Sequence, residues 1–293
     1  MKKILISGAN GLIGSHLVNR LSNDKEIELF LLSRNGITVP NGKSIEVDFS
    51  KDWDVSVLPP GINIIIHLAQ SENFRDFPNS ANDIFYVNTL STLKLADYAQ
   101  KNKVDHFIYA SSAGIYGNGD LSGFDENSDI VYKSDLGFYL ATKHCSEVIL
   151  DNYSNLLNVI MLRFFFVYGQ GQKSEMLIPR LVNNVKEGKS IKLSSENGLV
   201  INPTYVGDAV DAILACLNLQ KSYKINVAGP QILSLREIAD VIGEKVGKKP
   251  VFEINLSAIS AYMVGNIAKM NQLLGPPKID FKTGLDLYLK NIK

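Results

Sequence analysis

The sequence is poor in cysteine and carries no excess of charge of either sign. Cys145 and Cys216 lie far apart and belong to no Cys-x-x-Cys or Cys/His cluster, which argues against a disulfide scaffold and a zinc site. Thirty Lys and Arg residues balance thirty Asp and Glu residues, and only six of the basic residues are Arg. No run of like charge forms the basic surface that nucleic acids or anionic membranes require. We therefore predict no metal site, no nucleic-acid partner and a reducing compartment.

Long apolar runs are also missing. A membrane helix needs about 20 apolar residues, and no stretch of this chain approaches that length. The first apolar run, Ile4 to Ile6, is shorter than the roughly 7–15 residues of a signal-peptide core. The longest run, Ile62 to Ala69, has the length of a buried strand. We expect a soluble, cytoplasmic protein with no membrane partner.

The composition is that of a folded protein. Apolar residues make up 45% of the 293 residues and charged residues 20%, which excludes a disordered chain. At roughly 100–200 residues per domain, this length allows one large domain or two small ones.

Apolar blocks alternate with amphipathic blocks through the first half of the chain. The predicted strands are Lys3–Ser7, Glu26–Ser33, Ser44–Phe49, Asn63–Ala69, Phe107–Ser111 and Asn158–Arg163. The predicted helices between them are Leu12–Asn23, Asn82–Lys101 and Ser134–Tyr153. Apolar strands separated by helices indicate a parallel sheet with right-handed crossovers. We therefore predict an α/β fold with a doubly wound parallel sheet of the Rossmann type.

The pattern changes after Tyr168, where the elements become shorter. The predicted elements of this half are the helices Glu175–Lys186, Gly207–Leu219, Leu235–Val246 and Thr283–Asn291 and the strands Ser190–Leu193 and Lys224–Val227. We assign residues 1–169 to a dinucleotide-binding domain, to which 204–230 returns, and residues 170–293 to a smaller substrate-binding lobe.

A glycine-rich segment joins the first predicted strand to the first helix. It reads Gly8-Ala9-Asn10-Gly11-Leu12-Ile13-Gly14. A diphosphate can bind at such a helix N-terminus, held by backbone N–H groups and the helix dipole. The alternative is a simple strand–turn–helix corner, but the position inside a βαβ unit favours a dinucleotide site.

The end of the second strand distinguishes NAD from NADP in such folds. An acidic residue there holds the ribose 2′-hydroxyl, whereas Arg accommodates a 2′-phosphate. Here the strand ends in Ser33-Arg34-Asn35, without a carboxylate. The sequence therefore favours NADP over NAD, unless Arg34 is a plain surface charge.

Tyr139 and Lys143 lie four residues apart on a predicted helix and share one face. A phenol has a pKa of about 10, and a nearby ammonium group lowers it, which allows proton exchange with an alcohol. Ser112 follows the fifth strand, at the sheet edge where ligands bind, and can orient the reacting oxygen. Each feature alone is weak, since Ser111–Gly117 also suits an ordinary turn. Together, behind a glycine loop, they predict a catalytic Ser112, Tyr139 and Lys143.

With these residues in place, the chain resembles the extended short-chain dehydrogenases/reductases of the NAD(P)-dependent sugar-nucleotide epimerase/dehydratase type. Further matching segments extend over nearly the whole length. They are Val47-Asp48-Phe49, His67-Leu68-Ala69, Val87-Asn88, Leu162-Arg163, Val167-Tyr168-Gly169, Ile178-Pro179-Arg180, Tyr205-Val206-Gly207-Asp208 and Leu235-Arg236-Glu237.

The resemblance implies a sheet of about seven strands, a nicotinamide cofactor, and a homodimer through the helices 82–101 and 134–153. The candidate cofactor-binding residues are Gly8, Asn10, Gly11, Leu12, Ile13, Gly14, Ser33, Arg34, Asp48, Phe49, Leu68, Ala69, Asn88, Ser111, Tyr139, Lys143 and Phe166. The candidate substrate-binding residues are Gln70, Ala113, Gly114, Phe166 and Arg180.

Several departures from the family pattern bear on function. Family members that remove water carry an acidic pair directly after the catalytic hydroxyl residue, where this chain has Ala113 and Gly114, so a 4,6-dehydratase is not expected. Many members have Asn at the position of Phe166. Many also carry an Arg for the substrate diphosphate within the stretch occupied here by 199–201, and Arg75 or Arg180 could replace its charge.

The sequence thus predicts hydride transfer at a ring carbon of a nucleotide-activated sugar. We favour 4-keto reduction with NADPH, because of Arg34 and the missing acidic pair. The first alternative is a nucleotide-sugar 4-epimerase with tightly bound NAD. The second, from another functional class, is a non-catalytic cofactor-binding sensor.

Overall fold

The protein is described by a computed structural model that covers residues 1–131 and 136–290. The chain forms two compact units. The first comprises Met1–Ile115, Val131–Arg163 and Ile213–Ile225, and the second Tyr116–Ile130, Phe164–Ala212 and Asn226–Lys293. The assignment of 1–169, with 204–230, to one functional domain stays a prediction.

The first unit is built on a seven-stranded parallel sheet of order β11-β6-β5-β4-β1-β2-β3. The strands are β1 (Lys2–Ser7), β2 (Ile27–Ser33), β3 (Gly42–Glu46), β4 (Ile64–His67), β5 (His106–Ser112), β6 (Asn158–Phe164) and β11 (Tyr223–Val227). In the middle of the sheet, Ile4 on β1 is in register with Leu29 of β2 and Ile64 of β4, and all three are fully buried. The predicted fold class is confirmed.

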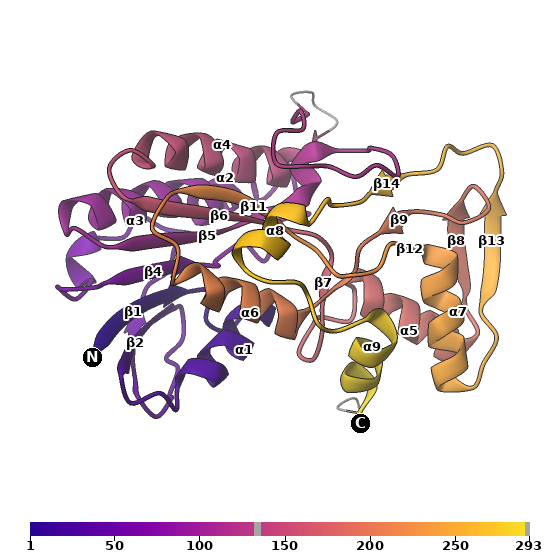
Figure 1. The fold of residues 1–293 in the computed structure, drawn as a ribbon, viewed down its shortest axis with the longest axis horizontal. Coiled ribbons are helices and arrows are strands. Elements are labelled where there is room, and N and C mark those ends of the chain that lie inside the picture. Colours follow the sequence, from indigo (N-terminus) through magenta and orange to yellow (C-terminus); the bar gives the residue numbers. More distant parts are fainter. Residues whose placement is uncertain (132–135, 291–293) are drawn as a thin grey trace. The chain divides into compact units, whose positions relative to one another are not determined.

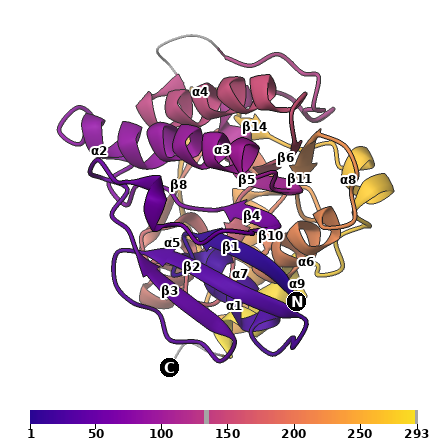
Figure 2. The same ribbon diagram turned by 90° about the vertical axis from the view of Figure 1, so that its left-hand side faces the viewer.

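Helices cover both faces of this sheet. Helices α2, α3 and α4 lie on one face and α1 on the other (Figure 1, Figure 2). Their bounds are α1 (Leu12–Leu21), α2 (Ala81–Phe85), α3 (Ser91–Lys101) and α4 (Phe138–Tyr153). A π-helical turn, Tyr86–Leu90, joins α2 to α3, so the predicted helix over 82–101 is one continuous helical segment. The last of these helices, predicted from Ser134, begins at Phe138 in the structure. Ser134 itself lies outside the described residues.

The strand predicted over Ser44–Phe49 is shifted in the structure. The ladder of β3 with β2 runs over Gly42–Glu46, although Lys43, Ser44 and Glu46 are exposed. Val47 and Phe49 are buried but follow the strand. The prediction followed the apolar residues, whereas backbone pairing at an edge strand does not require apolar side chains.

The second unit holds three small sheets and several helices. Its strands are β7 (Val167–Tyr168) with β10 (Thr204–Tyr205); β9 (Val200–Ile201) with β12 (Leu233–Ser234) and β14 (Tyr262–Met263); and β8 (Ser190–Ser194) with β13 (Val251–Asn255). Its helices are α5 (Leu177–Glu187), α6 (Val206–Cys216, whose last turn belongs to the first unit), α7 (Leu235–Val246), α8 (Ala268–Leu273) and α9 (Phe281–Leu289). Its core brings together apolar residues of α5, α7 and α9, including Val182, Ile242 and Leu285.

Helix α7 coincides with the predicted span because its first turn carries a full capping box. The Ser234 hydroxyl accepts the backbone N–H of Glu237 at 3.2 Å, and the Glu237 carboxylate accepts the backbone N–H of Ser234 at 2.8 Å. These bonds satisfy two backbone donors that the helix itself leaves unpaired.

We expect Ser234→Ala to lower the free energy of unfolding by about 1 kcal/mol, since the capping hydroxyl is lost. Urea denaturation monitored by circular dichroism measures this change. Glu237→Gln is the matched control, because an amide can also accept the Ser234 N–H. A loss in Glu237→Gln with no loss in Ser234→Ala would show that the charge at the helix end, and not the capping hydroxyl, is responsible.

Phe166 occupies an unusual backbone conformation for a bulky side chain. Its φ angle is +39°, in the left-handed region that Asn visits more readily than Phe. Its carbonyl accepts the backbone N–H of Thr204 at 3.2 Å. The backbone at this position therefore has a conformation that suits Asn better than Phe.

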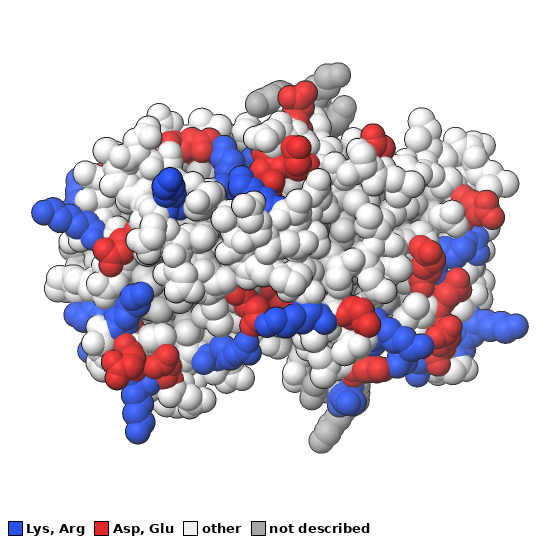
Figure 3. Space-filling view, viewed as in Figure 1, with Lys and Arg blue, Asp and Glu red and all other residues white. Residues whose placement is uncertain are grey.

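Charged side chains of both signs are interspersed among the described residues on the face drawn in Figure 3. Within residues 1–131 and 136–290, no helix is both long enough and apolar enough to cross a lipid bilayer.

Candidate functional site

The carboxyl ends of β1 and β4 meet in tight contact at the point where the sheet order reverses. Gly8 follows β1 with φ +71°, and a Cβ there would lie 2.7 Å from the backbone nitrogen of Ala69. A Cβ on Gly14 would lie 2.1 Å from the Gly8 carbonyl oxygen. Both positions therefore exclude any side chain, as a phosphate-binding loop requires. The structure thus brings the predicted glycine loop together with the predicted Leu68-Ala69 segment.

The N-terminus of α1 can hold a diphosphate. Gly11 is its N-cap residue, and among the described residues no side chain caps this end. The first turn also carries no acidic residue, so its N–H groups and the helix dipole suit an anion. Asn10 and Gly11 are exposed, and Leu12 and Ile13 are half-buried in the same loop and first turn. These residues fit a dinucleotide, whose diphosphate they would hold when it is bound.

The residues after β2 form an ion pair that the sequence does not reveal. The Ser33 hydroxyl donates to the Asn35 carbonyl, and the Arg34 guanidinium lies 3.0 Å from a carboxylate oxygen of Glu72. The hydrogen bond with Glu72 is the main cause that raises the pKa of Arg34 above its usual value. Arg34 is therefore not an isolated cation.

Asp48 and Phe49 follow β3. Hydrogen bonds from Ser50 to the Asp48 carboxylate hold its pKa below the usual range. Phe49 is buried, with its ring centroid 6.2 Å from that of His67. His67 itself is fully buried between hydroxyl groups, including Ser7 Oγ at 2.5 Å, and burial lowers its pKa to about 3. A neutral, hydrogen-bonded His67 is a packing residue.

Tyr139 contacts both a predicted catalytic residue and a predicted substrate-binding residue. Its hydroxyl donates to Gln70 Oε1 at 3.0 Å and is also hydrogen-bonded to Ser112. Burial raises the pKa of Tyr139 to about 12, and the Ser112 hydrogen bond opposes this rise. The ring of Phe74 packs against the Tyr139 ring at a centroid distance of 5.1 Å. Ser112 and Tyr139, predicted to be catalytic, thus share one site with Gln70, predicted to bind substrate.

Lys143 lies one helical turn beyond Tyr139 and is only 2% exposed. Its ammonium group donates to the Ala110 carbonyl oxygen at 2.8 Å and lies over the Tyr109 ring. Burial lowers the pKa of Lys143 to about 7, while the negative charge of Glu147 acts in the opposite direction. The ammonium is thereby tied to β5 through Ala110 and Tyr109.

A buried ion pair lies next to these residues. Arg163 on β6 donates to both Glu147 carboxylate oxygens, with the shortest distance, from Nη2, at 2.6 Å. The Ser111 hydroxyl donates to the same carboxylate at 2.5 Å. Glu147 is 1% exposed and Arg163 is 2% exposed by side chain. Glu147 was missed in the sequence, although its position four residues after Lys143 places it on the same face of α4.

The positions after Ser112 are tightly packed. Ala113 is buried, and a Cβ on Gly114 would lie 2.7 Å from the Leu140 side chain. Leu140 directly follows Tyr139, so the helix that carries Tyr139 also fills the space beside Gly114.

Asn88 lies in the π-helical turn and is fully buried. Its side chain accepts the Ser71 backbone N–H at 2.9 Å and donates to Thr142 at 2.9 Å. It therefore links the loop after β4 to helix α4. The remaining predicted site residues, Phe166 and Arg180, belong to the second unit, and their place near Ser112 stays a prediction.

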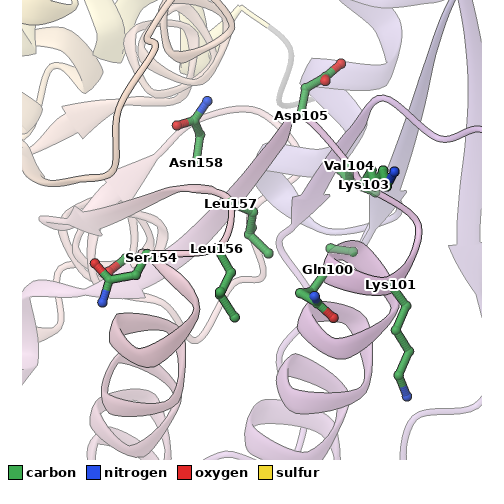
Figure 4. Close-up of a pocket in the computed structure, with 11 residues that line it drawn as sticks. Gln100, Lys101, Lys103, Val104, Asp105, Ser154, Leu156, Leu157 and Asn158 are labelled. Atoms are coloured by element: carbon green, nitrogen blue, oxygen red, sulfur yellow. The ribbon is translucent and has the colours of Figure 1, made fainter.

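A hollow of about 750 Å³ lies elsewhere in the first unit. Figure 4 shows its lining residues, among them Lys101, Asp105, Leu156 and Asn158. They lie at the C-terminal end of α3 and at the amino ends of β5 and β6. Ser112 is at the opposite, carboxyl end of β5, so this hollow is separate from the site of Tyr139.

The site thus combines a glycine loop at a strand–helix junction with a Ser, a Tyr and a Lys on β5 and α4. The chain that carries it can be compared with known families. A model of the NAD dependent epimerase/dehydratase family matches residues 4–228. The chain belongs to this family. The family resemblance predicted from the sequence is confirmed.

Individual relatives agree with this assignment. A "Putative UDP-glucose 4-epimerase" of Methanocaldococcus jannaschii is 28% identical, over 96% of this chain and 95% of its own length. The human dTDP-D-glucose 4,6-dehydratase is 26% identical, over 76% of this chain and 68% of its own. Among solved structures, the Bacillus cereus UDP-glucuronic acid 4-epimerase in complex with UDP-glucuronic acid and NAD aligns with a TM-score of 0.85 and 24% identity, over 98% of both chains. This last likeness shows the shared fold.

Proposed function

We propose that this family member is a nucleotide-sugar 4-epimerase that works with a retained NAD. The observation that carries the proposal is the Tyr139 hydroxyl, held by both Ser112 and Gln70 at the carboxyl edge of the sheet. Three polar groups converge on one point, where a sugar hydroxyl could replace Gln70 as the partner of Tyr139. NAD, when bound, supplies the acceptor and donor of hydride.

In this mechanism, Tyr139 would take the proton of the sugar 4-hydroxyl while C4 loses its hydride to the bound NAD. After the 4-keto sugar has turned over, hydride would return to the opposite face of C4 and Tyr139 would return the proton to the 4-oxygen. Ser112 orients the oxygen through its hydrogen bond. We assign to the positive charge of Lys143, one helical turn beyond Tyr139, the stabilisation of the tyrosinate, which would oppose the rise in the pKa of Tyr139 caused by burial. The reaction needs one proton-transfer group at one carbon, which is what this site provides.

Dehydration would need more than this site provides. Removing water requires an acid and a base at neighbouring carbons, and the residues after Ser112 are Ala113 and Gly114. A side chain at position 114 would also meet the end of the Leu140 side chain at 2.7 Å, so Leu140 would have to move to make room for it. These contacts support epimerisation over 4,6-dehydration, although the chain also matches dehydratases.

NADPH-dependent 4-keto reduction, which the sequence favours, remains the second candidate because Arg34 follows β2. The pairing of Arg34 with Glu72 weakens the argument for NADPH, since the guanidinium already has an anionic partner. The similarity to the M. jannaschii "Putative UDP-glucose 4-epimerase" further supports the epimerase.

The sharpest test combines cofactor identity with isotope tracing. The purified protein is denatured, and the released dinucleotide is identified by mass spectrometry. The untreated protein is then incubated with UDP-glucose, UDP-N-acetylglucosamine or UDP-glucuronic acid in deuterium oxide, without added cofactor. We expect co-purified NAD and a C4 epimer without deuterium at C4, because the hydride returns within the site.

Other outcomes would contradict the proposal in distinct ways. Turnover of a 4-keto sugar only with added NADPH would identify the reductase, and loss of water from the sugar would identify a dehydratase. Dinucleotide binding without turnover of any sugar would favour the sensor.

A homodimer through α2, α3 and α4 also stays a prediction. Its support is a set of exposed apolar side chains on these helices and the intervening turn: Phe85, Tyr86, Leu93 and Val148. Analytical ultracentrifugation of the wild type and of Leu93→Glu tests it, with a monomeric variant expected.

A further inference from the structure

The ion pair between Arg34 and Glu72 connects two segments that both lie at the cofactor edge of the sheet. Arg34 follows β2 and Glu72 follows β4, and β1 lies between these two strands. Their side chains meet at 3.0 Å, each with more than half of its surface exposed. The pair therefore bridges the strand ends on either side of the glycine loop that follows β1.

The backbone that carries Glu72 is firmly held. The neighbouring Ser71 is 2% exposed, and its backbone N–H donates to Asn88 at 2.9 Å. The Ser71 hydroxyl donates to Asp83 and accepts the backbone N–H of Asn73 at 3.0 Å. The Glu72 side chain is exposed, but the backbone from which it projects is anchored to the α2 segment. This anchoring keeps the carboxylate beside Arg34.

Further carboxylates act on this pair. Besides Glu72, the carboxylates of Asp48 and Asp83 act on the Arg34 guanidinium. A 2′-phosphate would add about two more negative charges to this surface, whereas the ribose hydroxyl of NAD adds none. A carboxylate can also accept a hydrogen bond from a ribose hydroxyl, the task usually given to an acidic residue at the end of β2.

From these contacts we propose that Glu72 determines the choice between NAD and NADP. Its carboxylate neutralises Arg34 and supplies, from the loop after β4, the negative charge that the end of β2 lacks. Arg34 then serves to hold Glu72 and does not recruit a phosphate. This inference rests on the NAD dependence in the proposed function and names the residue responsible for it.

The test measures dinucleotide binding, which requires no sugar. Bound nucleotide is removed from the full-length protein, and NADH and NADPH are titrated separately by fluorescence. We expect the wild type to bind NADH at least about tenfold more tightly than NADPH. In Glu72→Gln, NADPH affinity should rise by about tenfold, because the freed guanidinium can meet the 2′-phosphate. Adding Arg34→Ala to this variant should abolish the gain.

Glu28→Gln is the matched control. Glu28 pairs with Lys43 at 2.6 Å near the opposite end of β2, so its loss should leave the NADH/NADPH ratio at the wild-type value. Should the bound nucleotide resist removal, the identity of the dinucleotide that co-purifies with each variant gives the same comparison by mass spectrometry.

Two results would overturn the inference: a wild type that prefers NADPH, or a Glu72→Gln variant with an unchanged ratio. Neither depends on the sugar reaction. If no sugar is epimerised but the ratio shifts as expected, only the proposed activity fails. If the sugar is epimerised but the ratio stays constant, only the role of Glu72 fails.

Discussion

Replacing Tyr139 with Phe is expected to lower kcat for the sugar reaction by about 10²–10⁴-fold, because the group that carries the proton is removed. Phe retains the ring that packs 5.1 Å from Phe74, so the fold of the site should persist. KM for the sugar should change little, since the hydroxyl acts mainly in the transition state. Steady-state kinetics with the substrate identified by the assay above measure both constants.

Tyr98→Phe is the matched control for this change. The Tyr98 hydroxyl donates to the Pro59 carbonyl at 2.6 Å, away from the residues proposed for catalysis. Its removal should cost about 1 kcal/mol of stability and leave kcat near the wild-type value. A Tyr139→Phe enzyme with wild-type kcat would contradict the proposed mechanism, whichever sugar is the substrate.

Local sequence pattern was sufficient for the parallel sheet and for the glycine loop. Buried strands such as β1 are apolar on both faces, and α7 has a capping box at its start, so each signal lies within a few residues. The two-residue strands of the second unit, such as β7 and β9, have no such signal, because two residues show no periodicity.

The candidate site was only partly predictable for the same reason. Ser112, Tyr139 and Lys143 follow spacing rules within one βαβ region. The hydrogen bond of Gln70 to Tyr139 spans 69 residues of sequence, and Glu72 meets Arg34 across β1. Such pairs depend on how loops pack against each other, and a pattern of neighbouring residues carries no information about that packing. The sequence-based expectation that Arg34 binds a phosphate therefore did not take its ion pair with Glu72 into account.

The buried pair of Glu147 and Arg163 leads to the second large expected effect. Glu147→Gln should lower the free energy of unfolding by about 3–5 kcal/mol, because it leaves the Arg163 charge buried without its carboxylate. Denaturant unfolding at neutral pH measures this loss. The double variant Glu147→Leu/Arg163→Met is the control and should recover most of the stability, since apolar side chains of similar size can replace a buried ion pair.

The same substitution should also change the dependence on pH, which a purely structural role would not do. Burial lowers the pKa of Lys143 to about 7, and the Glu147 charge opposes that effect. Removing the charge lowers the pKa further, so the ammonium required by Tyr139 is lost at a lower pH. The alkaline limb of the kcat profile should therefore move to lower pH in Glu147→Gln.

The stability of the wild type provides an independent check on Lys143. The unfolded chain keeps the Lys143 proton up to a pH of about 10.4, whereas the folded chain releases it near 7. Between these values the unfolded state binds more protons, so this group makes the free energy of unfolding rise with pH. In Lys143→Met that rise should be reduced, as measured by urea unfolding across this range. An unchanged pH dependence in Lys143→Met, with an unmoved alkaline limb in Glu147→Gln, would mean that Lys143 is not the titrating group and that Glu147 only holds Arg163 in place.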